Sequence, residues 1–516
     1  MPAPLVSLRD VSRRFGPVLA NDRVSLDLAA GEVHALVGEN GAGKSTLMKV
    51  LYGLHPADSG TIEVEGRAVR IHNPTDAMRL GIGMVHQHFL LVDTLTVAEN
   101  VVLGTEPRGP LGVFAPGRAA RAVRALAERY RLPVDPRARV SSLSVGEQQR
   151  VEILKALHRG ARVLILDEPT AVLTPQEVDE LFAVLRELRD AGTSIVLITH
   201  KLAEVRALAD RVTVMRAGRV VGGGPVGEFD TARLAELMVG RVPAPLGARA
   251  ERAPGEPRLE ARGLTVRSTR GPAVVHDVTL AVHAGEIVGV AGVEGNGQHE
   301  LVECLAGLRP AAAGRVLVAG RDVTGRGARA HAEAGLAHIP ADRLRRGLVE
   351  DMTTAENLVL GRQREAAHGA WLGGPTLREA ARGPLAAHDV RPPDPDAIAG
   401  RLSGGNQQKL VVARELDRPV QALLAAHPTR GVDLGAVDAI HRRLLAARDA
   451  GLAVLLVSSE LSEILALSDR IVVMTGGRIV HTTTPAATDE RTLGLHMTGR
   501  ATLVDTPATT PPEARA

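Results

Sequence analysis

The stretch GENGAGKST, residues 38–46, decides the fold of the N-terminal half of the chain. It follows the strand-like run 32–38, opens a helical pattern, and fits G-x-x-x-x-G-K-[S/T], the pattern of a phosphate-binding loop. Its glycines let successive backbone N–H groups face a phosphate, and the helix N-terminus adds a partial positive charge. We expect contacts to a nucleotide from Gly38, Asn40, Gly41, Gly43, Lys44, Ser45 and Thr46.

Within this loop, Lys44 and Ser45 carry the chemistry. Lys44 would reach the β- and γ-phosphates of ATP, and the Ser45 hydroxyl would ligate Mg²⁺. The alternative is a glycine-rich turn with an incidental lysine. The chain holds only five lysines among its 62 basic residues, so chance placement of one here is improbable.

Polar residues suited to the same reaction lie at the ends of three further strand-like segments. VLILDEPT (163–170) ends with Asp167, which would hold Mg²⁺ through water, and Glu168, which would orient or deprotonate the attacking water. His200 closes SIVLITH and would contact the γ-phosphate, while Gln87 follows GIGMV. Alone, an Asp-Glu pair fits an ordinary turn better, and a lone histidine is more often structural. The phosphate loop that precedes the pair favours its functional interpretation, and the position of His200 at the end of a buried strand favours that of the histidine.

The periodicity of each half predicts an α/β fold. Short apolar runs such as 163–167 and 194–200 read as strands buried on both faces, as in a parallel sheet covered by helices. Residues 117–131 read as an amphipathic helix with Val123, Leu126 and Tyr130 on one face. We therefore expect an open sheet with an inserted helical subdomain in each half.

The chain repeats itself once. Lys44 and Gln298 stand 254 residues apart in matching segments, and Ser144 and Ser403 stand 259 apart. This nearly constant offset indicates a duplicated domain rather than a short-period solenoid. The expected parts are a first domain (1–241), a proline- and glycine-rich linker (242–257), a second domain (258–500) and a disordered tail (501–516).

Composition narrows the class of protein. The net charge of +3 comes without a block of like charges, which argues against a nucleic-acid partner. The single cysteine, Cys304, fits a reducing compartment, and the N-terminus lacks the apolar core of a signal peptide. No stretch approaches the ~18 apolar residues of a membrane span. A transport function would therefore need other chains to form the pore.

The segments LSVGEQ (143–148) and LSGGNQ (402–407) resemble the signature of ABC ATPases. Physically, Ser144 and Glu147 form an S-x-x-E capping box, so a helix starts there with N–H groups directed at a phosphate. The resemblance covers residues 3–500 and is greatest to the tandem ATP-binding subunits of simple-sugar and nucleoside importers. It implies two P-loop NTPase domains, each with a mainly parallel sheet, an antiparallel β subdomain and an inserted helical subdomain.

The resemblance also assigns roles to residues. Phe15 matches the aromatic that stacks on adenine, although a core position fits the sequence about as well. Gln87, which matches the glutamine that senses Mg²⁺ and the membrane partner, would join Ser45 and Asp167 as metal-site residues. In ABC dimers each ATP lies between one domain's phosphate loop and the other's signature. The complete site would therefore add Ser403, Gly404 and Gly405 to Lys44, Gln87, Asp167, Glu168 and His200.

The second half departs from the pattern at several positions together. Gln298 replaces the lysine in the loop between Gly292 and Glu300, a loop that includes Gly297, and His299 and Glu300 replace the hydroxyl pair. Ala426 and His427 replace the Asp-Glu pair, and Ser459 replaces the histidine. This degenerate site would face Ser144 and Gly146 of the first signature. We predict that it does not hydrolyse ATP at a useful rate.

These observations predict an ATPase that uses ATP and Mg²⁺ to energise an ABC importer. Its degenerate second half resembles the nucleoside branch; import of ribose or galactose is the alternative. The expected partners are two transmembrane permease subunits and, indirectly, an extracytoplasmic substrate-binding protein, with the chain peripheral on the cytoplasmic face of the membrane. A soluble tandem ABC ATPase acting on the ribosome is the rival from another class, which the short linker and single complete site disfavour. A scaffold without hydrolysis and an exporter are the remaining alternatives.

Overall fold

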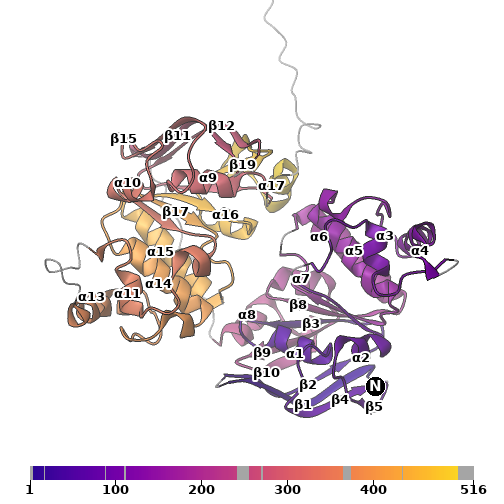
Figure 1. Cartoon of the computed structure of the whole chain (residues 1–516). Coiled ribbons are helices and arrows are strands. Elements are labelled where there is room, and N and C mark those ends of the chain that lie inside the picture. The colour runs from indigo at the N-terminus through magenta and orange to yellow at the C-terminus, as the bar shows by residue number, and fades with distance from the viewer. Residues whose placement is uncertain are drawn as a thin grey trace, which may run out of the picture. The chain divides into compact units, whose positions relative to one another are not determined.

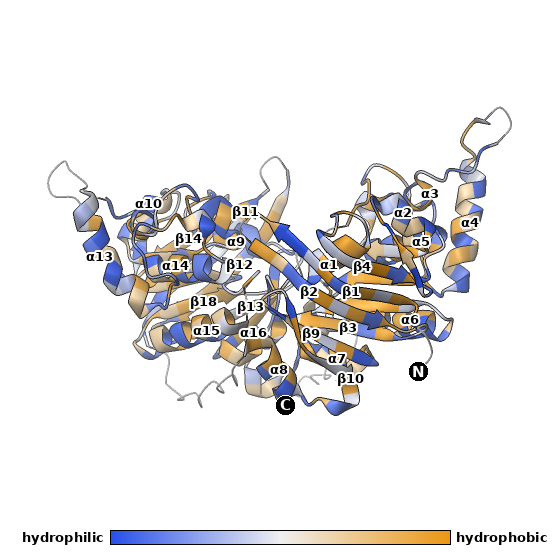
Figure 2. Cartoon of the chain, turned by 90° about the horizontal axis from the view of Figure 1, so that it is seen from below, coloured by the Kyte–Doolittle hydropathy of each residue, from blue (hydrophilic) through white to orange (hydrophobic). Residues whose placement is uncertain are grey.

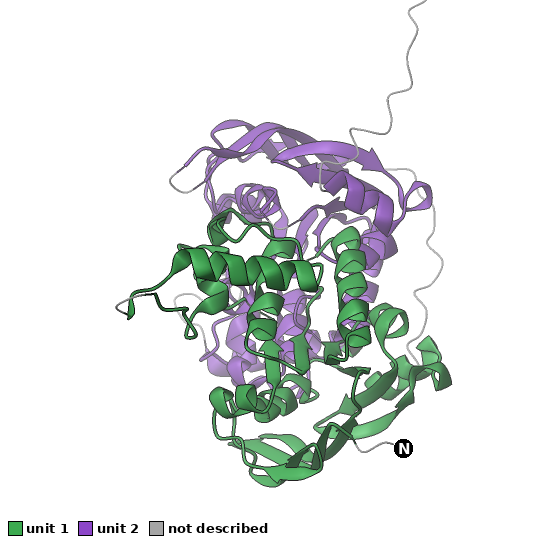
Figure 3. Cartoon of the chain, turned by 90° about the vertical axis from the view of Figure 1, so that its right-hand side faces the viewer, with its two compact units in different colours: residues 1–245, 433–435 green, residues 246–432, 436–516 purple. Residues whose placement is uncertain are grey.

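The computed structural model describes residues 4–16, 18–87, 89–109, 112–171, 173–240, 255–268, 271–293, 295–363, 373–432 and 434–497. The chain divides into two compact units, residues 1–245 with 433–435, and residues 246–432 with 436–516 (Figure 3). Within the described residues, no helix is long and apolar enough to cross a membrane.

A six-stranded sheet forms the centre of the first unit, in the order β10-β9-β3-β8-β7-β6 (Figure 1). Its strands are β3 (Val33–Gly38), β6 (Ile82–Val85), β7 (Val163–Asp167), β8 (Ser194–Thr199), β9 (Arg211–Arg216) and β10 (Arg219–Pro225). Strands β6, β7, β8, β3 and β9 pair in parallel, and only β10 is antiparallel. Every residue of β3, β6, β7 and β8 is buried, because helices and a second sheet cover both faces.

The second sheet of this unit is antiparallel and has four strands in the order β2-β1-β4-β5. It consists of β1 (Val6–Phe15), β2 (Val18–Leu28), β4 (Ser59–Val64) and β5 (Arg67–Val69). Alternate apolar residues of these strands, such as Leu8 and Leu28, pack with Leu47 of α1 (Lys44–Leu51) in one core cluster. Helix α1, which follows the phosphate loop, therefore packs between the two sheets.

The helical subdomain of the first unit forms its own core. It contains α3 (Val97–Val102), α4 (Pro116–Arg129), η2 (Val140–Ser142) and α5 (Val145–His158). Val123 of α4 is fully buried there, with Leu126 and Tyr130 partly buried against it, as the amphipathic pattern predicts. Figure 2 shows hydrophilic and hydrophobic residues alternating along α4. The remaining helices are α2 (Pro74–Arg79), α6 (Pro175–Asp190), α7 (Leu202–Leu208), η3 (Val226–Glu228) and α8 (Thr231–Val239).

The second unit repeats this plan strand for strand. Its sheets run β16-β17-β18-β13-β19-β20 and β12-β11-β14-β15. The strands are β11 (Pro257–Arg267), β12 (Ala273–His283), β13 (Ile287–Ala291), β14 (Ala313–Val318), β15 (Arg321–Asp322), β16 (Leu336–Ile339), β17 (Ala422–Ala426), β18 (Ala453–Val457), β19 (Arg470–Thr475) and β20 (Arg478–Thr483). The duplication read from the sequence is therefore a duplication of the whole fold.

The helices of the second unit follow the same order along the chain. They are α9 (Gln298–Leu305), α10 (Ala328–Glu333), η4 (Arg343–Gly347), α11 (Thr354–Leu358), α13 (Gly374–Ala387), η5 (Ala399–Arg401), α14 (Gly404–Leu416), α15 (Leu434–Asp449), α16 (Leu461–Leu467), η6 (Pro485–Ala487) and α17 (Glu490–Met497). Of these, η4 is a π-helix.

The fold class predicted from the sequence is confirmed, with shifts at some boundaries. The expected end of the linker at residue 257 is wrong, because β11 already begins at Pro257. Proline is tolerated as the first residue of a strand, where its missing N–H is not needed for pairing. Residues 242–254 of the expected linker and the tail 501–516 lie outside the described residues. The helical subdomain of the first unit begins at Val97, because the Thr96 capping box starts α3 there.

Candidate active site at the carboxyl ends of the parallel strands

The loop between β3 and α1 has the backbone that a phosphate site needs. Gly43 caps α1 with φ of 96°, and a Cβ at this position would stand 2.2 Å from the carbonyl oxygen of Ala20. Only glycine fits such a conformation and such close contact. Asn40 and Gly41 lie in the loop, and Thr46 lies in the first turn of α1. The structure therefore places these loop residues at the N-terminus of α1.

Lys44 is folded over this loop and is only 5% exposed. Its Nζ donates to the carbonyl oxygens of Gly38 at 2.8 Å and Glu39 at 2.9 Å. Burial lowers the pKa of Lys44, and the nearby carboxylates of Glu168 and Asp167 act in the opposite direction. The side chain is thus a buried cation at the head of the helix, positioned for charge-assisted contacts with phosphate oxygens.

Ser45 and Asp167 join the loop to the end of β7. The Ser45 hydroxyl donates to Asp167 Oδ1 at 2.9 Å. Burial raises the pKa of the Asp167 carboxyl, and the bond from Ser45 opposes this while the negative charge of Glu168 reinforces it. A hydroxyl and a carboxylate at this separation are hard oxygen ligands of the kind Mg²⁺ takes alongside substrate phosphates. The residues present therefore fit a magnesium ion.

Glu168 is held by two side chains from neighbouring strand ends. Its Oε1 lies 3.1 Å from His200 Nδ1, and its Oε2 accepts a hydrogen bond of 3.1 Å from Gln87 Nε2. Burial acts to raise the pKa of Glu168, but the hydrogen bond with His200 and the charges of His200 and Lys44 outweigh it. This pKa therefore lies below its usual value of 4.5. The carboxyl is kept ionised, as a group that accepts a proton from water must be.

The sheet order explains why these residues meet. The parallel strands β6, β7, β8 and β3 are consecutive neighbours, so their carboxyl ends lie along one edge. Ligands of open α/β sheets bind at that edge. Gln87 follows β6, Asp167 ends β7, His200 follows β8, and Lys44 follows β3. The order of the parallel strands alone thus brings together residues that are far apart in the sequence.

Phe15 lies at the end of β1 and is 39% exposed. Its ring contacts His55 edge-on, with centroids 5.2 Å apart, and the Arg13 guanidinium lies 4.7 Å from the ring centroid. The alternative of a core position is therefore wrong. The same hairpin carries Asn21, whose buried amide donates to the Gly43 carbonyl at 3.0 Å. No sequence pattern singled out Asn21.

The first signature begins α5 with a capping box. Ser144 Oγ accepts from Glu147 N, and Ser144 N donates to the Glu147 carboxylate at 2.8 Å. The first turn lies close to a second carboxylate, because a Cβ on Gly146 would stand 2.8 Å from Glu177 Oε1. Two carboxylates, those of Glu147 and Glu177, therefore lie at this helix start.

The second signature begins α14 without acidic residues in the first turn. Ser403 Oγ accepts from the backbone N–H and the side-chain amide of Asn406, at 3.4 and 2.9 Å. A Cβ on Gly404 would stand 2.7 Å from an Arg343 guanidinium nitrogen, so a cation approaches this turn, and Gly405 is buried behind it. The two signatures thus present opposite electrostatic surroundings to an anion.

In the second unit, the loop after β13 has the same backbone conformation at its helix cap as the phosphate loop of the first unit, but it lacks the positive charge of a lysine. Gly292 follows β13, and Gly297 caps α9 with φ of 93°. Gln298 takes the position of Lys44, is 7% exposed, and donates from Nε2 to the Val293 carbonyl at 3.2 Å. The amide thus reproduces the folded-back packing of the lysine but brings no cation to the loop.

The end of β17 shows the same replacement. Ala426 is the last residue of this strand, and His427 follows it with φ of 45°. His427 Nδ1 accepts a hydrogen bond of 3.3 Å from the backbone N–H of Ser459. No carboxylate stands at these two positions, so a metal ligand and a proton acceptor for water are both missing from the sequence here.

The chain matches known proteins over most of its length. The ABC transporter family profile matches residues 21–171 and 275–430, together more than half of the chain. The nucleoside import ATP-binding protein NupA of Lactococcus lactis is 46% identical over 96% of this chain and 98% of its own length. The guanosine import ATP-binding protein NupO of Bacillus subtilis is 47% identical over 96% and 97%. The glucose import ATP-binding protein of Haloferax volcanii is 46% identical over 96% of both chains.

The fold, the converging strand-end residues and these matches define a tandem ATP-binding ATPase. The chain belongs to the ABC transporter family. The resemblance inferred from the two signature sequences is thereby confirmed.

Proposed function

We propose that the chain is the ATP-hydrolysing subunit of an ABC importer, with one hydrolytic site per chain. The observation that carries this proposal is the Glu168 carboxylate, held between His200 and Gln87 beside the Ser45–Asp167 pair. Lys44 neutralises phosphate charge, Glu168 orients and accepts a proton from the attacking water, and His200 fixes that carboxylate. Rate acceleration comes from aligned groups and preorganised charge.

Mg²⁺ is proposed as the cofactor of this site. Ser45 and Asp167 would hold it, Asp167 through water, and Gln87 would contribute from the end of β6. Bound there, the ion would neutralise charge on the β- and γ-phosphates. Among the described residues no cluster of three or more His, Cys, Asp or Glu could hold a metal alone. This agrees with an ion that is bound together with nucleotide phosphates.

The second signature is proposed to complete the hydrolytic site. Its first turn carries a neutral Asn406 and lies close to Arg343, whereas the first signature carries Glu147 and lies close to Glu177. The surroundings of the second signature favour an anionic γ-phosphate, whereas the carboxylates near the first signature repel it. We therefore assign Ser403, Gly404 and Gly405 to the ATP of Lys44. The acidic first signature is assigned to the degenerate loop around Gln298.

Nucleosides are the proposed class of substrate. The relatives that match almost the whole chain include nucleoside and guanosine import proteins, and the second half lacks the Asp-Glu pair at 426–427. The glucose import relative, at similar identity, supports sugar import as the second candidate. We propose that the membrane and substrate-binding partners decide between these two classes of cargo.

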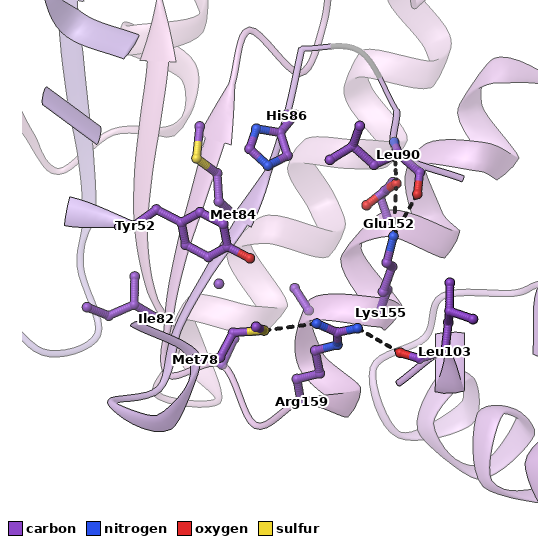
Figure 4. Close-up of a pocket in the computed structure, with 13 residues that line it drawn as sticks. Tyr52, Met78, Ile82, Met84, His86, Leu90, Leu103, Glu152, Lys155 and Arg159 are labelled. Atoms are coloured by element: carbon purple, nitrogen blue, oxygen red, sulfur yellow. Dashed lines mark hydrogen bonds and ion pairs between the residues drawn. The ribbon is translucent and has the colours of Figure 1, made fainter. Parts of the chain in front are cut away.

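A cavity beside the active site is proposed to receive a cytoplasmic loop of a permease subunit. It has a volume of about 230 Å³ and lies between α2, β6 and α5 (Figure 4). Tyr52 and Met84 form an apolar side, and Lys155 and Arg159 border it with bonds to the carbonyls of Leu90 and Leu103. Strand β6 lines the cavity and leads directly to Gln87, so a segment docked here would act on the residue that contacts Glu168.

Two such permease subunits and an extracytoplasmic substrate-binding protein complete the proposed importer. The chain would then lie on the cytoplasmic face of the membrane, attached through the permeases.

The test is uptake of labelled nucleosides, ribose and galactose by cells with the chain, without it, and with Lys44→Ala. Loss of nucleoside uptake alone in the two defective strains is the expected result. Loss of sugar uptake alone would keep the importer and replace the substrate. Unchanged uptake of all three would contradict an importer for these cargoes while leaving the ATPase to be assayed directly.

A further inference from the structure

The second unit has an insertion where the first has the segment after Gln87. Strand β16 is followed by Ala341 at the position of Gln87, and then by the π-helix η4. Asp342 closes this turn, because its Oδ1 accepts from the N–H groups of Leu344 and Arg345 at 3.1 Å each. Single π-turns often occur at functional sites, so we consider which contacts the side chains of this turn make.

Arg343, the first residue of η4, binds two other segments of the second unit. Its Nε donates to Gln407 Oε1 at 3.3 Å, on the signature helix α14. Its two terminal nitrogens donate to the carbonyls of Arg430 at 2.9 Å and Gly431 at 3.4 Å, in the loop that follows β17. One guanidinium therefore ties the signature helix to the loop beyond His427.

The signature turn is shaped to accept this side chain. Gly404 has no Cβ, and a Cβ there would meet an Arg343 nitrogen at 2.7 Å. Gln407 is itself fixed, because its amide donates to the Ala399 carbonyl at 3.2 Å and it is buried. In the first unit the matching turn meets the carboxylate of Glu177 instead of a guanidinium. The arginine contact is thus a property of the second signature.

We infer that Arg343 is a positioning residue for ATP hydrolysis. It holds the turn Ser403–Gly405 and the segment 430–431 in one arrangement, so that the signature meets the γ-phosphate without first having to be ordered. A guanidinium suits this task because its donors point in fixed directions, whereas an ammonium is a single point charge. The inference rests on the proposed pairing of this signature with the ATP of the first domain.

The experiment measures steady-state ATPase of the full chain as Arg343→Ala, Arg343→Lys and Arg345→Ala. Arg345 is the matched control, since it lies in the same turn, is exposed, and makes no side-chain bond among the described residues. We expect Arg343→Ala to lower kcat about 10-fold with KM for ATP within about 2-fold, because misplacement of a catalytic surface slows the chemical step more than binding to the other loop. Arg343→Lys should recover only part of kcat, and Arg345→Ala should match the wild type.

Three results would overturn the inference: equal kcat for Arg343→Ala and Arg345→Ala, full recovery by lysine, or a parallel loss of kcat, ATP affinity and Tm that marks a merely structural role. If Arg343→Ala does not yield folded protein, Arg343→Lys decides by the same split between kcat and KM. Glu168→Gln is assayed beside these variants. Unchanged activity in that variant would reject the proposed hydrolytic site, whereas unchanged activity in Arg343→Ala alone would reject only the positioning role.

Discussion

The two halves of the chain share a backbone at the phosphate site and differ in its chemistry. Gly43 and Gly297 cap their helices with φ of 96° and 93°, and Glu168 and His427 follow their strands with φ of 49° and 45°. The strand order is the same in both. The fold therefore depends on glycines and apolar strands, and it survives the exchange of every charged group that catalysis needs.

The replacements keep contacts while changing what the contacts can do. Gln298 donates to its loop as Lys44 does, but without a charge. His427 accepts from the backbone of Ser459, where Glu168 is paired with His200. Equivalent substitutions in the two halves should consequently have unequal effects, and each of the following predictions tests that inequality.

The largest difference is expected at the strand ends that carry Glu168 and His427. Glu168→Gln removes the proton acceptor and should lower ATPase activity about 100-fold or more. His427→Gln, at the equivalent position, should leave activity within about 2-fold, because this residue has no carboxylate to lose. Steady-state phosphate release by the two purified variants measures the comparison. Similar losses in both would show that the halves are not functionally distinct.

The phosphate loops should differ next. Lys44→Ala removes a buried, charge-assisted contact and should weaken ATP binding about 10-fold or more, whereas Gln298→Ala should change it little. Gln298→Lys restores the charge but not the carboxylates missing at Ala426 and His427. We therefore expect tighter nucleotide binding in this variant without a second hydrolytic site. A doubling of kcat in Gln298→Lys would contradict the explanation from the missing carboxylates.

Substitution of Gln87 tests the proposed link between the cavity and the active site. The second half has Ala341 at this position and therefore has no such side chain. Gln87→Ala should lower substrate uptake about 5-fold or more. ATPase activity should fall less than uptake, because His200 still holds Glu168, and ATP affinity should change little, because the substitution interrupts coupling between two sites rather than phosphate binding. Uptake in cells and ATPase of the purified variant are compared. Ala341→Gln is the control and should leave both unchanged. A loss of ATP affinity in Gln87→Ala equal to the loss of uptake would oppose the coupling role.

The smallest effect concerns pH. The wild-type pKa of Glu168 lies below 4.5, so its carboxylate is ionised above that pH and the acid limb of kcat from this group lies below it. His200→Ala removes the strongest lowering contact and leaves burial, which raises the pKa. The acid limb should therefore move to higher pH. Normalised profiles of kcat from about pH 5 to 8 show this, and superimposable profiles would speak against it.

Much of the fold could be read from the sequence because its signals are local. The run 163–167 was predicted as a strand and is one, and the capping box at Ser144 starts α5. Buried parallel strands are continuous apolar runs, and helix starts carry their own capping residues. The order of elements then follows from the repeat. The gathering of Lys44, Asp167 and Glu168 at one edge likewise follows from where strands end.

Other parts of the site have no local signal. Asn21 supports the phosphate loop from a hairpin far back in the sequence, and nothing in the letters around it indicates a buried amide. Arg343 lies in a π-turn, whose hydrogen bonds follow no apolar periodicity, and its acceptors are 64 or more residues away. Such contacts depend on tertiary packing. The sequence likewise does not distinguish a core position from an exposed one for Phe15, because its exposure depends on tertiary packing around the ring.

The presence of the complete and the degenerate domain on one polypeptide has a consequence for assembly. If the complete and the degenerate cassettes were separate chains, random pairing would produce three kinds of dimer, one of them without any hydrolytic site. The duplication that matches Lys44 with Gln298 and Ser144 with Ser403 ensures that each synthesised molecule supplies one of each. Stoichiometry is thereby set by translation rather than by affinity. The second half is then free to lose Lys, Asp and Glu without ever producing an inert pair.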